Sequence, residues 1–439
     1  MPVNYLKYSV LGTALVITSL LVLYAIPEFD LGGFHFKRIN ILADIMKQDK
    51  SDTTAIDKSL LVKPVFADTC KTGVTCVEDY TKDTSGMRIF LAALDSAKFR
   101  SVRIAYFADS YVEGDIMLDP LRDTMQAVFG GSGVGFVPIT SEVAGFRQTI
   151  NHTYEGFTDY SIIGERSPQH PIGPAGHVFV PQAGNRVTYS AVKRARLNSF
   201  PTAILYYSSA TGATIQLNET QTVDLPASEG LRKIKLGDNL QSLKLSVQGD
   251  ADLYGMSFES TSGITVDNFS VRGNSGMGLG FVSEQMYAAF EAQHHYDLVV
   301  LDYGLNVANE KAKNYDWYIR GMNKVLETMK KAFPHSSILM VGCSDRGAKV
   351  DGEIKTMPGI KELIASQRKM AADNQVCFWD MFEAMGGDST MVRWAGMKPR
   401  LANTDYTHPT YYGGKKVAEI LMGTLLYEKE KYDRKKKSL

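Results

Sequence analysis

The feature of this sequence that most constrains its fold is a regular alternation of short apolar segments and longer amphipathic segments after about residue 263. The segment Leu298-Val299-Val300-Leu301 is apolar at every position, which is typical of a strand buried on both faces of a sheet. Strands are predicted at residues 264–271, 298–303, 338–342 and 376–380, and helices at residues 283–293, 315–333, 360–373 and 411–427. Strands that alternate with helices of this length indicate a parallel sheet covered on both faces, so the sequence predicts an α/β domain.

A further strand and helix of the same kind are predicted upstream, at residues 102–108 and from about residue 116 to 129. Ser110 lies in the turn between them. A hydroxyl there stands just past the carboxyl end of a strand, where open α/β sheets place their sites, and beside a helix N-terminus, whose free N–H groups stabilise anions. A serine in such a turn is also a common helix cap, so the role of Ser110 depends on the rest of the chain.

Between about residues 145 and 262 the pattern changes, because short alternating runs replace the helices. Runs of this kind occupy residues 177–180, 186–189, 203–207, 214–217, 233–236, 243–247 and 253–258. Turn residues separate them at short intervals, as in an antiparallel sandwich. The sequence therefore predicts a β-sandwich module that is inserted into the α/β domain.

The N-terminal region has the pattern of a membrane anchor. Residues 10–26 carry no charge and are mostly apolar, which reaches the lower end of the length that spans a bilayer. Pro27-Glu28-Phe29 follows in place of a small-residue cleavage signal, so an uncleaved transmembrane helix is preferred to a removed signal peptide. The flanking basic residues do not settle the orientation, but Cys70 and Cys76 close a short loop that suits an oxidising compartment. We expect a chain anchored in the cell envelope, with its main domain in the periplasm or otherwise outside the cytoplasm.

Charge and metal-ligand patterns exclude some partners. Lys and Arg together number 48, as do Asp and Glu, so no overall field favours nucleic acid. The basic tail, residues 429–439, is interpreted as a solvated terminus, with weak contact to lipid headgroups or polyanions as the alternative. Cys343 and Cys377 lie in apolar runs and are expected to be buried thiols. There is no Cys-x-x-Cys pattern or histidine cluster, so we expect no metal and no cofactor.

Chemically useful residues follow several of the predicted strands. Ser110 follows the first strand, Gly273 the second and Asn306 the third, while Asp405 and His408 lie just before the last helix. Singly, these residues are explained as turn residues, caps or a surface histidine. Together, in this order at strand ends, they indicate the catalytic site of a nucleophilic hydrolase.

These residue types support acyl transfer through a covalent intermediate. His408 would remove the proton of Ser110 during attack on an ester carbonyl and later return it to the leaving alcohol. Asp405 would hold the tautomer of the imidazole and stabilise the imidazolium. The oxyanion hole would consist of the backbone N–H groups of Ser110 and Gly273 and the side-chain amide of Asn306.

With these residues in place, the chain resembles the SGNH hydrolases, a branch of the GDSL esterases and lipases. The similar blocks are Ala108-Asp109-Ser110, Gly273, Gly304-Leu305-Asn306 and Asp405-Tyr406-Thr407-His408. The resemblance covers about residues 100–427 apart from the insertion, and it implies a flavodoxin-like three-layer α/β domain. Ala108 departs from the glycine that the family usually has, and 163 positions separate Ser110 from Gly273, far more than a minimal member needs.

The long insertion makes the chain similar to the O-acetylpeptidoglycan esterase branch, whose insertion resembles a carbohydrate-binding module. Residues 135–138, 263–268 and 378–387 are also similar to that branch. The resemblance implies a serine esterase that removes O-acetyl groups from an envelope or extracellular polysaccharide such as peptidoglycan. An O-acyltransferase and a non-catalytic glycan-binding protein are the alternatives, and the β module could also be a lid or spacer. The expected division is an anchor or signal segment, a stalk, the first hydrolase part, the β module, the second hydrolase part and the basic tail, at residues 1–30, 31–95, 96–144, 145–262, 263–428 and 429–439.

Overall fold

The computed structural model describes residues 18, 29–31, 34–36, 70–312 and 314–438. The chain divides into two units, residues 1–55 and 56–439. In the first unit, β1 (Phe29–Leu31) pairs antiparallel with β2 (Phe34–Phe36). The predicted anchor at residues 10–26 lies, apart from Thr18, outside the described residues. Within the described residues, no helix combines the length and the apolar character that crossing a membrane requires.

The second unit is built on a six-stranded sheet, as the alternating sequence pattern predicts. In the order of their neighbours, its strands are β14 (Gly263–Ser270), β4 (Ser101–Ala108), β15 (Leu298–Asp302), β16 (Ser337–Val341), β19 (Cys377–Trp379) and β3 (Glu78–Asp79). The first five run parallel, whereas β3 is antiparallel to β19. Because β4 lies between β14 and β15, Ser110, Gly273 and Asn306 all follow the carboxyl ends of neighbouring strands.

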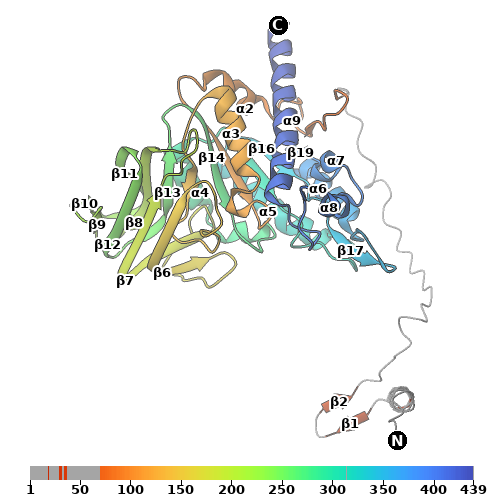
Figure 1. Ribbon diagram of the computed structural model, residues 1–439, viewed down its shortest axis with the longest axis horizontal. Helices are drawn as coiled ribbons and strands as arrows, with labels where there is room; N and C mark the ends of the chain where they lie inside the picture. Colours follow the sequence, from red (N-terminus) through yellow and green to blue (C-terminus); the bar gives the residue numbers. More distant parts are fainter. Residues whose placement is uncertain (1–17, 19–28, 32–33, 37–69, 313, 439) are drawn as a thin grey trace, which may run out of the picture. The chain divides into compact units, whose positions relative to one another are not determined.

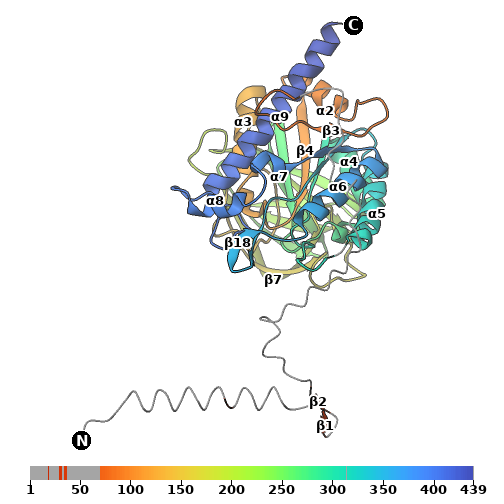
Figure 2. The same ribbon diagram turned by 90° about the vertical axis from the view of Figure 1, so that its right-hand side faces the viewer.

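Helices cover both faces of this sheet, which confirms the predicted α/β architecture. They are α2 (Arg88–Ala93), α3 (Leu118–Phe129), α4 (Glu284–His294), α5 (Asp316–Ala332), α6 (Ile360–Asn374), α7 (Met381–Met385), α8 (Thr390–Gly396) and α9 (Tyr411–Lys437), with 3-10 turns η2 (Leu94–Ser96), η3 (Glu113–Asp115) and η4 (Met277–Phe281). The connection from β4 to β14 adds a strand on one side of β4. The later connections, from β14 to β15, β16 and β19, cross to the other side of β4 and continue in that direction. Right-handed crossovers therefore place α3 on one face, packed against α9, and the row α4, α5 and α6 on the other (Figure 2).

The inserted region is antiparallel, as predicted, but its hydrogen bonds join the strands into one nine-stranded sheet rather than two. The strands are β5 (Gly135–Val137), β6 (Asn151–Ser161), β7 (His177–Ser190), β8 (Phe200–Ser209), β9 (Ala213–Leu217), β10 (Gln221–Leu225), β11 (Ser228–Leu240), β12 (Ser242–Gly249) and β13 (Asp252–Glu259) (Figure 1). Two strands predicted at residues 177–180 and 186–189 are the two ends of β7. The sequence pattern did not predict β6, because the burial of its residues does not alternate and the strand carries no period-two signal.

The β module is packed firmly onto the α/β part because two of its strands are buried on both faces. In β8, Leu205 and Tyr207 point into the core of the module, whereas Tyr206 belongs to the main core. The ring of Tyr206 lies 5.1 Å from that of Phe290 in α4. Leu253 and Tyr254 of β13 are divided between the two cores in the same way.

The predicted stalk, residues 31–95, extends too far toward the C-terminus. Residues 78–79 form β3 of the central sheet, and α2 buries Phe90 and Leu91 in the main core. The polar residues around these short elements hide them from a pattern search, since each element is too short to show a period. The expected disulfide between Cys70 and Cys76 is present, and Cys343 and Cys377 are buried and unpaired, as predicted.

Candidate active site

The structure brings three of the predicted site residues into one hydrogen-bonded row. Ser110 Oγ lies 3.1 Å from His408 Nε2, and His408 Nδ1 lies 2.7 Å from Asp405 Oδ2. With a proton on Nδ1, the imidazole donates to Asp405 and accepts from the serine hydroxyl. The side chains of His408 and Asp405 are 37% and 48% exposed, so the row is open to solvent and to a large ligand.

The turn after β4 fixes Ser110 without a helix N-terminus beside it. Asp109 Oδ1 accepts a hydrogen bond of 2.9 Å from the backbone N–H of Tyr111, and Asp109 O accepts one of 3.2 Å from Val112. The first helical turn, η3, begins at Glu113, and α3 begins only at Leu118. The prediction that Ser110 lies beside a helix N-terminus is therefore wrong, because Gly114 (φ +74°) interrupts the helical path before α3.

Short-range hydrogen bonds also hold the loop that carries Asp405 and His408. Asp405 Oδ1 accepts from the backbone N–H groups of Thr407 at 2.9 Å and His408 at 3.1 Å. Partial burial works to raise the pKa of Asp405, but the hydrogen bonds from the His408 ring and these amides outweigh it and lower that pKa. The carboxylate therefore stays ionised and orients the imidazole.

The start of α9 places this loop next to the serine turn. Thr410 caps α9 by accepting from Gly413 N. A side chain at Gly414 would put its Cβ 2.4 Å from Ile116 O, so only glycine allows α9 to approach this closely. The Gly413-Gly414 pair thus brings the His408 loop to the segment that follows Ser110.

Gly273 follows the carboxyl end of β14, next to β4, which leads to Ser110. Its φ of +76° favours glycine, whereas a Cβ there would meet only Ile163 Cγ2 at 3.9 Å, which is ordinary contact. The backbone is held by the N–H of Val271, which donates to Ala108 O at 3.0 Å. Ile163 comes from the β module, so the inserted region reaches this side of the site.

Asn306 is held by two acceptors that the sequence analysis did not identify. Its Nδ2 donates to Asp109 Oδ2 at 2.8 Å and to the backbone oxygen of Asn274 at 3.0 Å. The amide of Asn306, in the loop after β15, therefore points toward the serine turn. Both of its N–H groups already donate to these acceptors, so one of them would have to donate to two acceptors at once in order to stabilise an oxyanion. Asp109 directly precedes Ser110, and this position is the sequence signal that could have suggested that Asp109 holds Asn306.

Two buried carboxyl groups lie near Ser110: Asp109 in the serine turn and Asp302 at the end of β15. Burial raises the pKa of Asp109 to about 6, although hydrogen bonds from Tyr111 and Asn306 lower it. Burial also raises the pKa of Asp302 to about 8, and the neighbouring charge of Asp109 adds to that shift. Asp302 accepts a hydrogen bond of 2.9 Å from Tyr106 Oη. Within the described residues, neither carboxyl group has a basic side chain within 4.0 Å.

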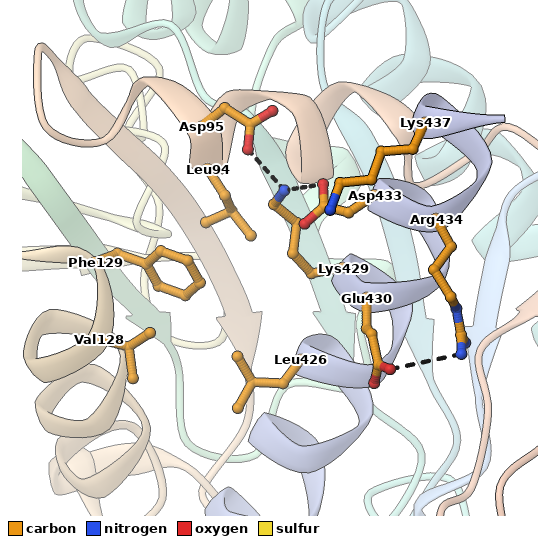
Figure 3. A pocket seen from close by; sticks show the side chains of 10 residues that line it. All are labelled: Leu94, Asp95, Val128, Phe129, Leu426, Lys429, Glu430, Asp433, Arg434 and Lys437. Carbon is orange, nitrogen blue, oxygen red and sulfur yellow. Dashed lines mark hydrogen bonds and ion pairs between the residues drawn. The ribbon is translucent and has the colours of Figure 1, made fainter. Parts of the chain in front are cut away.

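A surface pocket lies away from these residues, at the amino edge of the sheet (Figure 3). It has a volume of about 510 Å³ and lies between the end of α3, η2 and the last turns of α9. Most of its charged side chains form ion pairs, as between Lys429 Nζ and Asp95 Oδ1 at 2.7 Å. Among the described residues, no three His, Cys, Asp or Glu side chains are grouped so that they could hold a metal ion.

Comparison with known proteins identifies the fold. No protein-family model and no curated protein matches the sequence. A solved structure of a peptidoglycan O-acetylesterase matches with a TM-score of 0.67 and 20% identity, over 81% of this chain and 99% of that chain. The chain shares the fold of that structure, a mixed α/β fold of the SGNH-like type. The resemblance that the sequence motifs indicate is thus confirmed at the level of the fold.

Other esterase structures match with much lower scores. They are an acetyl xylan esterase (17% identity, TM-score 0.29, over 36% of this chain and 80% of that one) and a family two carbohydrate esterase from Cellvibrio japonicus (8% identity, TM-score 0.27, over 68% and 99%). These scores are too low to bear on the fold.

Proposed function

We propose that this chain is a serine esterase that removes O-acetyl or other short acyl groups from an envelope or extracellular polysaccharide. The observation that carries the proposal is the row from Ser110 Oγ through His408 to Asp405, with separations of 3.1 and 2.7 Å. A hydroxyl beside an imidazole that is oriented by a carboxylate is the arrangement that activates a serine nucleophile.

In the first half of the reaction, Ser110 Oγ attacks the ester carbonyl carbon and His408 Nε2 takes the hydroxyl proton. The carbonyl oxygen becomes an oxyanion near the N–H groups of Ser110 and Gly273 and the amide of Asn306. Loss of one such donor typically costs roughly 10²- to 10³-fold in rate. The C–O bond to the sugar then breaks, and His408 returns the proton to the leaving sugar hydroxyl.

In the second half, water replaces the sugar. His408 removes a proton from the water as its oxygen attacks the acyl-serine, and the collapse of the second intermediate releases a carboxylic acid and restores Ser110. An O-acyltransferase would share the first half but would use a sugar hydroxyl in place of water. The open setting of the row favours hydrolysis, because water reaches His408 freely.

A polysaccharide substrate is supported by the comparison and by a contact of the β module. The solved structure that shares the fold over 81% of this chain is a peptidoglycan O-acetylesterase. The β module places Ile163 beside Gly273, so it can contribute to a surface that holds a long substrate. We assign glycan binding to this module, residues 145–262, and ester cleavage to the two hydrolase parts, residues 96–144 and 263–428.

We also propose that residues 10–26 anchor the enzyme in a membrane and that the hydrolase lies in the periplasm or elsewhere outside the cytoplasm. The uncharged apolar sequence of this segment supports the anchor. The disulfide between Cys70 and Cys76 supports an oxidising compartment.

The test is mass spectrometry of the full chain after brief exposure to an activated ester or a phosphonate. We expect one adduct, on Ser110, and none in the folded Ser110→Ala variant. Acetate release from an acetylated oligosaccharide is followed in parallel. A folded Ser110→Ala variant with full turnover would refute the assignment. Acetylated acceptor in excess of free acetate would favour the transferase, and glycan binding without any ester cleavage would favour a binding protein.

A further inference from the structure

A half-buried arginine lies at the carboxyl edge of the sheet, beside the proposed active site and outside its machinery. Arg346 follows β16, the strand next to the one that leads to Asn306. The backbone N–H of the next residue, Gly347, donates to Tyr406 O at 2.8 Å, two residues before His408. Arg346 Nη1 donates to Leu305 O at 3.3 Å, one residue before Asn306. The segment Arg346-Gly347 therefore contacts both loops, the His408 loop through the backbone of Gly347 and the Asn306 loop through the side chain of Arg346.

The charge of Arg346 distinguishes it from the other arginines of similar burial. Among the described arginines that are not exposed, all but one form an ion pair with a carboxylate, namely Arg103, Arg122, Arg147, Arg196 and Arg368. Arg346 is the exception, since no carboxylate oxygen of the described residues lies within 4.0 Å of its guanidinium. A partly desolvated cation without a counterion is costly unless a ligand supplies the negative charge.

We propose that Arg346 binds a carboxylate of the substrate, and hence that the enzyme acts on an acidic glycan. The inference rests on the proposed esterase function and names its substrate class. A guanidinium presents five N–H donors in a planar fork that matches a carboxylate. One of these donates to Leu305 O, which leaves donors for a ligand. Because Arg346 lies one loop from Asn306, the carboxylate belongs to the sugar that carries the ester or to its neighbour in the chain.

A purely structural role would produce a different result. If the bond from Arg346 to Leu305 only positions Asn306, a substitution lowers kcat on every ester, since oxyanion stabilisation acts in the transition state. If Arg346 binds a substrate carboxylate, the substitution raises KM for acidic glycans and leaves neutral esters unaffected. The two roles therefore separate by substrate as well as by kinetic constant.

The experiment uses the full chain in detergent with Arg346→Gln, Arg346→Lys and the control Arg434→Gln. Arg434 pairs with Glu430 on α9, near the pocket at the other edge of the sheet. The substrates are O-acetylated oligogalacturonate, O-acetylated xylo-oligosaccharide of matched length and acetylation, and a small chromogenic acetyl ester. For Arg346→Gln we expect KM on the acidic substrate to rise about tenfold or more, because a charge-assisted bidentate contact is lost. The other two substrates should change by less than about twofold.

Arg346→Lys should lie between the wild type and Arg346→Gln, because lysine keeps the charge but not the fork. Arg434→Gln should behave as the wild type on all substrates. Equal losses on all three esters, or a wild type that is active but has no preference for the acidic oligosaccharide, would overturn the proposal.

Failure of the esterase function is detected separately. Deacetylated oligogalacturonate is titrated by calorimetry into Ser110→Ala, with and without Arg346→Gln. Binding that depends on Arg346 supports the carboxylate site even if no ester is cleaved. Binding that is unchanged by Arg346→Gln overturns it even if the enzyme is an active esterase.

Discussion

The two edges of the central sheet differ in whether their acidic side chains have basic partners. At the amino edge, Lys429 lies between Asp95 and Asp433, and most of the charged side chains that line the surface pocket form ion pairs (Figure 3). At the carboxyl edge, Asp109 and Asp302 are buried without a cation within 4.0 Å among the described residues. Buried carboxyl groups without a basic partner, rather than a surface pocket, therefore distinguish the edge of the sheet that carries the proposed active site.

The largest expected effect concerns the carboxylate of the catalytic row. Asp405→Asn should lower kcat by roughly 10²- to 10⁴-fold, because an amide can stabilise the wrong imidazole tautomer and cannot stabilise the imidazolium. Turnover of the chromogenic ester measures this. Asp433→Asn, at the amino edge, is the matched control and should keep full activity. A near-wild-type rate for Asp405→Asn would contradict the assignment of catalysis to the carboxyl edge of the sheet.

The second prediction concerns the residue that holds Asn306. Asp109→Ala should lower kcat by roughly 10²-fold with little change in KM, because Asn306 loses the acceptor 2.8 Å from its amide and its aim at the oxyanion. If Asp109 acts through Asn306, the double variant with Asn306→Ala should be no slower than the slower single variant. If the fold-losses in kcat of the two single variants multiply in the double variant, Asp109 acts independently of Asn306.

The third prediction concerns stability and pH. The pKa of Asp302 is about 8 in the folded chain against an ordinary value near 3.8, so the folded state holds a proton that the unfolded state releases. The contribution of this group to stability is therefore full below about pH 4 and is lost as pH rises toward 8. In Asp302→Asn this loss should be absent. The free energy of unfolding of the variant should therefore rise relative to that of the wild type between pH 5 and 9, by on the order of 1 kcal/mol or more.

Urea unfolding at pH 5, 7 and 9 measures this difference. Asp373→Asn is the control, since Asp373 is exposed and pairs with Lys369 on α6. A constant offset between Asp302→Asn and the wild type at all three values would contradict the raised pKa.

The smallest effect is expected at the amino edge. Lys429→Gln should lower the free energy of unfolding by about 1 kcal/mol or less, because its partners Asp95 and Asp433 are partly exposed and keep solvent contact. Activity should stay within about twofold of the wild type. A large loss of turnover on an acetylated oligosaccharide would show that the pocket between α3 and α9 takes part in function.

The sequence predicted those parts of the fold that depend on local periodicity. The fully apolar run at residues 298–301 marks β15 because a parallel strand is buried on both faces. Strand β6 escaped prediction because its exposed face and irregular burial leave no pattern. Elements β3 and α2 escaped because their apolar residues become a core only through contact with distant segments.

Prediction of the candidate site had a similar limit. Order along the chain was enough to nominate Ser110, Gly273, Asn306, Asp405 and His408, since parallel strands bring their carboxyl ends together. The contact between Asn306 and Asp109 joins residues 197 positions apart and depends on the exact rotamer of each. No local pattern encodes such a pairing. That Arg346 has no carboxylate partner among the described residues is likewise visible only once the neighbouring carboxylates have been placed.

The double-faced burial of β8 and β13 has a consequence for how a polymer would be processed. A module joined by a flexible tether samples many separations from the serine, but Tyr206 and Tyr254 lock this module onto the hydrolase body. If the module binds a sugar unit, as we propose, that unit would lie at a fixed distance from the ester that Ser110 attacks, and the enzyme would select esters by their position relative to the bound unit.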